Sequence, residues 1–432
     1  MQNEALQRAK GVRDFGPAEK IARDKLIQTL RSVFELYGYN PIETPVMERY
    51  ELFASKYGIG QESDAMRETF KLKDQGLRDL VLRTEFTVPF ARFVGMNPQL
   101  KMPFKRYQIG KVFRDGPIKL GRYREFYQCD VDVVGVSNPA VDAELVKLIN
   151  TVFSKLNLEV VIKTNNRNVL NAILSKCGVP EESQISAIIS IDKFDKIGDV
   201  GVKAELLDKK INAETADEIL KTLALTGSNI EKIQSLKDLL GEIDGLKDLE
   251  KTINLVGADN LEFIPNLARG LAYYTGNVFE VFLKDTSQLS SSICAGGRFD
   301  NMIGGFIGTD EKYPAVGVSF GLDTIFDALQ IQNKGILSKQ SVAEIYVLPV
   351  SKENFAPAFQ LVEKLRAKGI AADIDFLERK VGKNMEYANS YGMPWVIVLG
   401  DDEVKQEKYT LKNMTTGEQV SCSFEEICTK VK

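Results

Sequence analysis

The sequence predicts an α/β protein of several domains, and three observations support this. The chain has 432 residues, enough for two to four domains of ordinary size. Hydrophobic residues make up 44% of it and charged residues 27%, which is normal for domains with buried cores. Strand-like and helical patterns occupy different stretches of the chain. We therefore expect a strand-rich core with a helical insertion, followed by a small α/β domain.

The N-terminal part is expected to begin with an amphipathic helix over residues 18–37, whose apolar side chains recur at helical spacing. Residues 41–46 then indicate a short strand. Pro45 cannot donate to a strand ladder, so this strand should lie at an edge or an interface. Residues 104–114 and 122–134 predict a β-hairpin joined by the loop DGPIKLG. Such a long hairpin loop suggests a function.

The rest of the chain divides into further segments. Residues 165–255 are short helical patterns rich in Lys, Asp, Glu and Leu, which predict a helical insertion. Residues 256–330 return to strand-like runs and complete the core that residues 1–164 begin. Residues 329–342 look like a linker. From residue 343 to 432, strands and helices alternate, which predicts a small α/β domain.

The composition excludes several classes of protein and of chemistry. Lys and Arg (56) nearly balance Asp and Glu (60), which argues against a generally polybasic nucleic-acid binder. Histidine is absent, so an imidazole base, a Ser-His-Asp triad and histidine metal ligands are excluded. The five cysteines form no CxxC pair, and we expect buried reduced thiols rather than a metal site. Without an apolar run of about 18 residues or a signal-peptide core, we expect a cytoplasmic protein and no membrane partner.

The predicted hairpin has unusually polar faces. A period of two places on one face of its second strand Arg122, Arg124, Phe126, Gln128, Asp130 and Asp132. The same rule groups on its first strand Arg106, Gln108 and Arg114. Faces with so many charged and amide side chains are unlike those that pack in a hydrophobic core. They are either solvated or form the floor of a site for an anionic substrate, with Arg for phosphate and Asp for a cation or donor.

Two further motifs could carry chemistry. In LARGLAYYTG, Arg269 precedes the adjacent Tyr273 and Tyr274, whose side chains should point to opposite sides. One tyrosine could then pack while the other offers its hydroxyl, although both could simply be core aromatics. In AGGRFD, Gly296 and Gly297 would permit close approach of the backbone to a ligand, or form a plain turn.

Together these segments resemble the histidyl-tRNA synthetases, a family of class II aminoacyl-tRNA synthetases, over nearly the whole chain. GYNPIETPVME resembles class II motif 1, and VFRDGPIKLGRYREFYQCDVDVVG resembles motif 2. LARGLAYYTG and AGGRFDNMIGGF resemble the two histidine-specific motifs. The resemblance implies a class II antiparallel-sheet catalytic core with residues 165–255 inserted. Residues 343–432 resemble the family's α/β anticodon-binding domain.

The resemblance also implies an activity. ATP would activate L-histidine to histidyl-adenylate, and the histidyl group would then pass to tRNA-His. Neither step needs an enzyme nucleophile, so a histidine-free enzyme can catalyse both by positioning and charge stabilisation, with Mg²⁺ and arginine at the phosphates. A homodimer formed through motif 1, at Pro45, is the implied assembly.

Site residues follow from these motifs and from LRTEFTVPFAR, which resembles the family segment that holds the amino acid's α-ammonium group. Arg114 and Arg269 would be catalytic and contact the α-phosphate of ATP, and Arg122 would assist ATP binding. The residues implied to bind histidine are Thr84, Glu85, Gln128, Asp132, Tyr273 and Tyr274. Among these, Glu85 would hold the α-ammonium group and Asp132 would pair with an imidazole nitrogen. Lys119, in the hairpin loop, would contact a tRNA phosphate.

Three positions depart from the family's motifs. Gly116 stands where motif 2 usually has glutamate, Thr324 where motif 3 usually has arginine, and Ala272 where aspartate is common. A missing arginine would suit a second hypothesis, a histidine-sensing paralogue of the kind that serves as the regulatory subunit of ATP phosphoribosyltransferase. That paralogue lacks the anticodon-binding domain that residues 343–432 resemble, so an active synthetase is the favoured interpretation.

Overall fold

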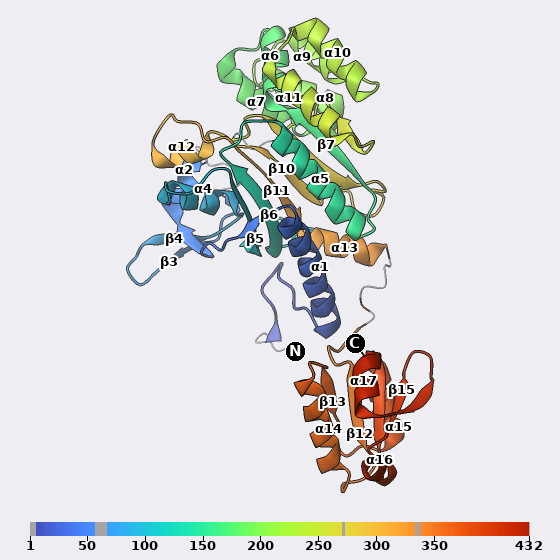
Figure 1. Cartoon of the computed structure of the whole chain (residues 1–432). Coiled ribbons are helices and arrows are strands. Elements are labelled where there is room, and N and C mark those ends of the chain that lie inside the picture. Colours follow the sequence, from blue (N-terminus) through green and yellow to red (C-terminus); the bar gives the residue numbers. More distant parts are fainter. Residues whose placement is uncertain (1–5, 57–66, 270–272, 333–336, 338, 432) are drawn as a thin grey trace. The chain divides into compact units, whose positions relative to one another are not determined.

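The computed structural model describes most of the chain, namely residues 6–56, 67–269, 273–332, 337 and 339–431 (Figure 1). The chain forms two compact units. The first comprises residues up to 13 together with 27–331, and the second comprises 14–26 together with 332–432. No helix in the described ranges is long and apolar enough to cross a membrane.

An eight-stranded sheet forms the centre of the first unit, in the order β1-β5-β6-β11-β10-β9-β7-β8. Its strands are β1 (Asn40–Pro41), β5 (Phe104–Phe113), β6 (Glu125–Val134), β7 (Val160–Asn166), β8 (Leu261–Phe263), β9 (Asn277–Leu283), β10 (Cys294–Arg298) and β11 (Ala315–Gly321). The outer pairs β1–β5 and β7–β8 are parallel, and the pairs between them are antiparallel. The expected antiparallel core is therefore confirmed.

The two faces of this sheet differ in polarity. One face packs through aromatic side chains against α5 (Ala140–Lys155) and against the part of α1 (Pro17–Leu36) that belongs to this unit. The ring of Phe320 lies 5.5 Å from that of Phe34 and 5.9 Å from that of Phe153, measured between centroids. Because side chains alternate along a strand, the neighbours of Phe320 on β11 face the other way. That opposite face carries the polar residues expected from the sequence.

A smaller sheet and several helices adjoin the large sheet. The smaller sheet has the order β2-β4-β3 and consists of β2 (Met47–Arg49), β3 (Lys71–Lys73) and β4 (Asp79–Leu82). The adjoining helices are α2 (Tyr50–Lys56), α4 (Thr87–Met96), α12 (Met302–Ile307) and α13 (Leu322–Ile331). Since α13 continues to Ile331, residues 329–331 belong to a helix, and the linker expected from 329 was placed too early.

The strand expected over residues 41–46 is also wrong. β1 ends at Pro41 and β2 begins only at Met47, so Pro45 lies in an irregular segment between two strands. Proline lacks the N–H that a strand ladder needs. The carbonyl of Pro45 instead accepts a hydrogen bond from Nη1 of Arg83 at 3.3 Å. The carbonyl of Pro45 is therefore bonded by the Arg83 side chain and not by a neighbouring strand.

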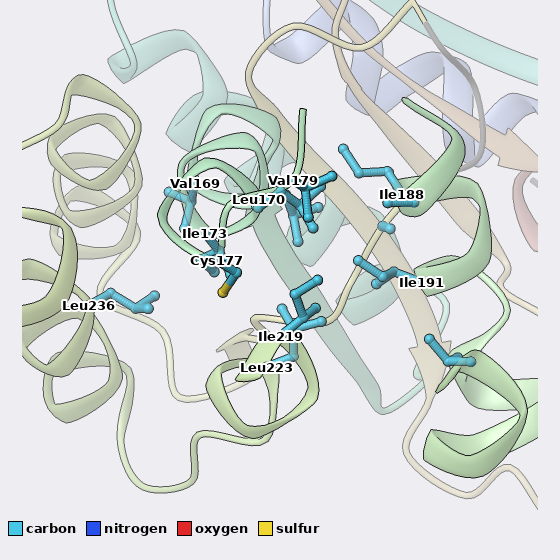
Figure 2. Packing of buried hydrophobic residues seen from close by; sticks show 14 of the residues in the cluster. Val169, Leu170, Ile173, Cys177, Val179, Ile188, Ile191, Ile219, Leu223 and Leu236 are labelled. Atoms are coloured by element: carbon cyan, nitrogen blue, oxygen red, sulfur yellow. The ribbon is translucent and has the colours of Figure 1, made fainter. Parts of the chain in front are cut away.

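Six helices lie between β7 and β8 and form the expected helical region. They are α6 (Arg167–Lys176), α7 (Glu181–Ile191), α8 (Phe194–Asp208), α9 (Ala213–Leu223), α10 (Asn229–Leu240) and α11 (Asp244–Val256). Figure 2 shows their shared apolar core, in which Ile173, Ile188 and Ile219 are almost fully buried. This region therefore has a hydrophobic core of its own.

The second unit contains a five-stranded sheet in the order β13-β12-β14-β15-β16. Its elements are β12 (Ile345–Pro349), α14 (Phe355–Ala367), β13 (Ala372–Ile374), α15 (Val381–Ser390), β14 (Trp395–Leu399), α16 (Asp401–Gln406), β15 (Tyr409–Asn413), β16 (Gln419–Cys422) and α17 (Phe424–Val431). The first five elements match the expected alternation of strand and helix. All five cysteines of the chain are buried and free, as expected.

Candidate active site

A cavity of about 410 Å³ opens over the polar face of the large sheet. Nine of the ten site residues expected from the sequence line it: Thr84, Glu85, Arg114, Arg122, Gln128, Asp132, Arg269, Tyr273 and Tyr274. Lys119 is not among the lining residues. The lining thus draws together segments that are far apart along the chain.

Strand register explains why the hairpin residues meet. Gln128 and Asp132 both belong to β6 and share a face, as the period of two predicted. Arg106 on β5 lies opposite Asp132. The expectation that Arg122 and Arg124 belong to the same strand face is wrong, because β6 begins only at residue 125. Both arginines lie in the β5–β6 connection instead.

Two carboxyl groups line the floor of the cavity, and one buried arginine lies beside them. Asp130 and Asp132 are 4% and 3% exposed, and Arg106 beside them is fully buried. Oδ2 of Asp132 lies 2.6 Å from Nη2 of Arg106. Burial raises the pKa of Asp130 to about 7, although Arg106 opposes this and Asp132 adds to it. Burial likewise raises the pKa of Asp132 to about 6, with Glu85 adding to the effect.

Some buried polar atoms at the floor and in the arginine beside it lack hydrogen-bond partners. Within the described ranges, all six such buried side-chain atoms belong to four residues: Arg106, Gln128, Asp130 and Asp132. The contact between Arg106 and Asp132 is an ion pair without hydrogen-bond alignment. Buried polar groups in proteins are nearly always hydrogen-bonded. A cluster of exceptions beside a cavity therefore indicates a place for a polar ligand.

The walls of the cavity supply further charges. Nε of Arg114 donates to the carbonyl of Thr84 at 3.0 Å, which orients its guanidinium group. Oε1 of Glu85 accepts a hydrogen bond from the N–H of Val88 at 3.0 Å, at the start of α4. Arg269 forms an ion pair with Glu280 of β9. Because these charged groups are held by neighbours, their positions are set before any ligand arrives.

The two adjacent tyrosines do not point to opposite sides. Their ring centroids lie 4.6 Å apart, and both rings line the cavity. Tyr273 lies in a turn, where the alternation of a strand does not apply. Burial by itself lowers the pKa of Arg269, but Tyr274 and Glu280 outweigh it and raise that pKa. Arg269 therefore stays a cation at the cavity wall.

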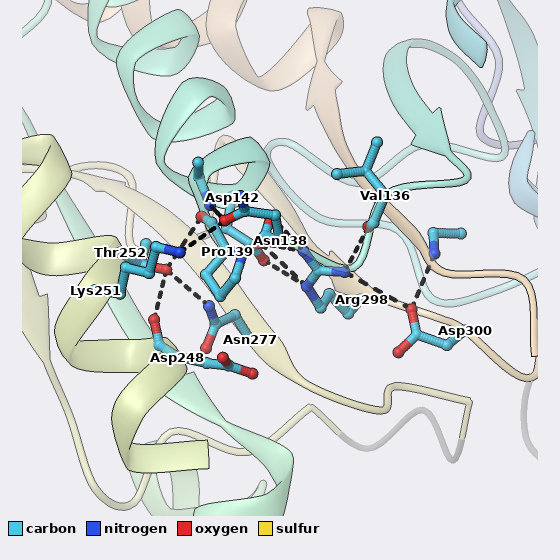
Figure 3. Close-up of polar contacts among 12 residues, drawn as sticks. Val136, Asn138, Pro139, Asp142, Asp248, Lys251, Thr252, Asn277, Arg298 and Asp300 are labelled. Carbon is cyan, nitrogen blue, oxygen red and sulfur yellow. Dashed lines mark hydrogen bonds and ion pairs between the residues drawn. The ribbon is translucent and has the colours of Figure 1, made fainter. Parts of the chain in front are cut away.

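The glycine pair and the arginine that follows it have different roles. Gly296 and Gly297 line the cavity, whereas Arg298 is not among the lining residues. Figure 3 shows Arg298 bonded to Asp142 of α5 and to the carbonyl of Val136. The shortest of these contacts joins Nη2 of Arg298 to Oδ2 of Asp142 at 2.5 Å. Arg298 therefore ties β10 to α5 behind the cavity.

Two of the three departures from the motifs also line the cavity. A Cβ on Gly116 would lie 2.9 Å from the carboxyl of Glu68, which is itself a lining residue. Glu68 thus brings a carboxyl group to the place where the sequence lacks one. The hydroxyl of Thr324 donates to the carbonyl of Gly121 at 3.2 Å. Ala272 lies outside the described residues.

Sequence reasoning missed several lining residues, including Glu68, Ser319 and Asp323. Asp130 was on the predicted polar face but received no role. Glu68 and Asp323 carried no local signal, because only the fold brings them to the hairpin. The amide Nε2 of Gln128 donates to the hydroxyl of Ser319 at 2.6 Å, a contact between two strands that are distant in sequence.

Comparison with known proteins shows which family this chain resembles. The model of the family described as histidyl-tRNA synthetase matches residues 11–325, and that of the anticodon binding domain matches residues 344–432. Histidine–tRNA ligase 1 of Bacillus cereus and that of Bacillus anthracis are both 42% identical to this chain over 421 residues. The match covers 96% of this chain and 94% and 97% of theirs.

Solved structures show the same likeness. Histidyl-tRNA synthetase from a Nostoc species is 32% identical, with a TM-score of 0.85, and the match covers 99% of this chain and 98% of that one. A Bacillus halodurans protein described as an ATP phosphoribosyltransferase regulatory subunit/histidyl-tRNA synthetase shares the fold, at 22% identity and a TM-score of 0.75. That match covers 92% of this chain and 99% of that one. From its site, its family match and its relatives, the chain belongs to the histidyl-tRNA synthetase family of aminoacyl-tRNA ligases.

Proposed function

We propose that this protein uses ATP to activate L-histidine to histidyl-adenylate and then transfers the histidyl group to tRNA-His. The observation that supports this best is a single cavity lined by three arginines, Arg114, Arg122 and Arg269, above the carboxyl groups of Asp130 and Asp132. Arginine is suited to phosphate, and carboxyl groups are suited to the N–H donors of histidine. One cavity can therefore hold both substrates of the first step.

In the first step, a carboxylate oxygen of histidine attacks the α-phosphorus of ATP. A new P–O bond forms as the bond to the β-phosphate oxygen breaks, and pyrophosphate leaves. The protein contributes positioning and positive charge rather than a nucleophile. Arg114 and Arg269 would stabilise charge on the α-phosphate, and Arg122 would hold the phosphate chain.

Histidine would be recognised by paired polar contacts. Glu85 would bind the α-ammonium group, and Asp132 would accept a hydrogen bond from an imidazole nitrogen. Thr84, Gln128 and the two tyrosines would complete the pocket. A buried acceptor left unpaired is costly, so an apolar amino acid of similar size would be rejected.

ATP use follows from membership of the ligase family, and Mg²⁺ would arrive with ATP. The described residues form no group of three or more acidic or thiol side chains that could hold a metal ion. A Mg²⁺ ion would be held chiefly by phosphates and water, as is common for nucleotide substrates. When bound, the ion would neutralise phosphate charge.

In the second step, the terminal adenosine of tRNA attacks the acyl carbon, and AMP leaves. Residues 343–432 would bind the anticodon, and Lys119 in the β5–β6 connection would contact the acceptor end. The catalytic core would comprise residues 1–164 and 256–330, with the helical insertion at 165–255 beside it. A homodimer is proposed through the segment around Pro45.

The regulatory paralogue is not favoured. Two relatives that match across 96% of this chain are histidine–tRNA ligases, and the anticodon-binding model matches residues 344–432. The likeness to the Bacillus halodurans protein, at 22% identity, concerns the fold alone.

Histidine-dependent ATP–pyrophosphate exchange tests the proposal. The unchanged protein should catalyse exchange only when histidine is present, and Arg269→Ala should abolish it. Arg78→Ala is a matched control, because this arginine is 73% exposed and pairs with Asp74 across the β3–β4 turn. If histidine binds by calorimetry but no exchange occurs, the protein is a sensor and not a ligase.

A further inference from the structure

Arg13, near the N-terminus, lies in a cluster of charged groups that adjoins the cavity. Its Nη2 lies 2.6 Å from Oδ1 of Asp323, and its Nη1 lies 3.2 Å from Oδ1 of Asp327. These carboxylates are one helical turn apart on α13, and both are nearly buried. The guanidinium group lies over the ring of Tyr123, 3.5 Å from its centre. One side chain thus joins α13 to the β5–β6 connection.

The start of α13 bonds to the same connection through further contacts. The hydroxyl of Tyr123 donates to Oδ2 of Asp327 at 2.9 Å. Oδ2 of Asp323 accepts from the N–H of Tyr127 at 2.7 Å, at the start of β6. The hydroxyl of Thr324 donates to the carbonyl of Gly121 at 3.2 Å. Both the middle and the end of the connection are therefore bonded to one turn of α13.

The charges of this cluster hold its geometry together. Burial by itself lowers the pKa of Arg13, but Asp327 and Asp323 outweigh it and raise that pKa. Burial and the carboxylate of Asp327 raise the pKa of Tyr123 to about 12, so its hydroxyl remains a donor. A lysine could not bridge two carboxylates and stack on a ring at the same time, because it lacks the planar fork.

The cluster adjoins the part of the cavity assigned to ATP. Arg122, Tyr123 and Asp323 all line the cavity, and Arg122 is the neighbour of the tyrosine on which Arg13 stacks. Thr324 at this turn brings a hydrogen bond to the connection rather than a charge. Arg13 itself is not among the lining residues, so it acts through the groups that it holds.

We propose that Arg13 is a positioning residue for ATP: it clamps the β5–β6 connection to α13 and so keeps Arg122 over the cavity. This inference rests on the proposed function, because Arg122 has this role only if the cavity binds ATP. It assigns a task to an N-terminal residue that is far from the motifs in sequence.

Steady-state ATP–pyrophosphate exchange on the full chain tests the inference. Arg13→Ala should raise the KM for ATP about tenfold, because small displacements of positioning groups are costly, and leave the KM for histidine within about twofold. Arg13→Lys should still raise the KM for ATP, and its increase in log KM should be more than half of that in Arg13→Ala. Asp327→Asn keeps the contact between Arg13 and Asp323 and should give a smaller rise in the KM for ATP. Arg78→Ala should match the unchanged protein.

Each other outcome would overturn the inference. If Arg13→Ala melts normally and its KM for ATP stays within twofold, Arg13 does not position ATP. If both KM values rise together and the melting temperature falls, the role of Arg13 is only structural. If Arg13→Ala does not fold, the KM for ATP of Asp327→Asn is the test. An unchanged KM for ATP in Asp327→Asn would refute the proposed role of Arg13. Absence of exchange in the unchanged protein would refute the proposed function, and this inference with it.

Discussion

Gly317 determines where the carboxyl group of Asp132 can lie, so Gly317→Ala probes the histidine pocket directly. Gly317 on β11 pairs with Asp132 on β6. A Cβ on Gly317 would lie 2.5 Å from Cγ of Asp132 and 2.8 Å from the carbonyl oxygen of Val131. Ordinary contacts of carbon are about 3.5–4.0 Å. Oδ1 of Asp132 would lie closer still, so the Asp132 side chain must move by more than about 1 Å, and the short contact with the Val131 oxygen also strains the pairing of β6 with β11.

The cost of this movement can be worked from the site. Asp132 is 3% exposed, and its Oδ2 lies 2.6 Å from Nη2 of Arg106. A displaced carboxyl group can no longer meet an imidazole N–H at hydrogen-bond distance. A hydrogen bond to a charged group contributes about 1.5–3 kcal/mol. The KM for histidine should therefore rise roughly 10- to 150-fold, since about 1.4 kcal/mol is tenfold.

Exchange kinetics with histidine and ATP varied separately measure the effect. We expect the KM for ATP to change by less than about threefold, because the arginines on the cavity walls are untouched. Gly382→Ala in α15 is the matched control, since a Cβ there meets nothing within 4 Å and α15 belongs to the second unit. A histidine KM for Gly317→Ala within about threefold of the control, in a protein that melts normally, would refute the assignment of Asp132.

Two further predictions concern stability. Arg298→Ala should destabilise the first unit by about 3–5 kcal/mol, because it leaves the fully buried Asp142 unpaired. Lys203→Ala, which breaks a pair that is 34% and 61% exposed, should cost at most about 1 kcal/mol. Amide hydrogen exchange in α5 and β10 compares the two variants. Equal protection of these amides in Arg298→Ala and Lys203→Ala would contradict the prediction. The pKa of Asp130 is raised to about 7, above the roughly 3.9 of an unfolded chain, so the native state binds the proton more tightly. Stability should therefore fall as pH rises from about 4 through 7, and Asp130→Asn should lessen that fall in thermal melts. If the melting temperatures of Asp130→Asn and the unchanged protein depend on pH in the same way, Asp130 is not the group responsible.

Secondary structure was predictable where the pattern is local and strong. The helix expected over 18–37 is α1 (Pro17–Leu36), and the first five elements of the second unit follow the predicted order. Their apolar residues recur at the helix or strand period, which requires no knowledge of partners. β15 and β16 were missed because YTLKN and QVSC are short and polar. They are strands only because β14 and then β15 offer them a pairing edge.

The candidate site was predictable in part for a different reason. The polar face of β6 followed from the period of two, and the other site residues followed from motifs that resemble a family. No periodicity indicates that Arg269 and Asp130 should line one cavity, or that Glu68 should lie beside Gly116. The error over Arg122 and Arg124 has the same origin, because the start of β6 depends on where pairing with β5 begins. Strand ends are set by partners and not by the strand alone.

By itself, then, the sequence determined which chemistry is possible here. Without histidine, imidazole catalysis is excluded, and the arginines and carboxylates that can act by positioning and charge are visible in the motifs. Tertiary structure decided how these charges act. Burial beside Arg106 and Asp132 raises the pKa of Asp130 to about 7, and α13 gives Arg13 its two carboxylates. Both effects depend on distance and on exclusion of water, which exist only once segments remote in sequence have packed together.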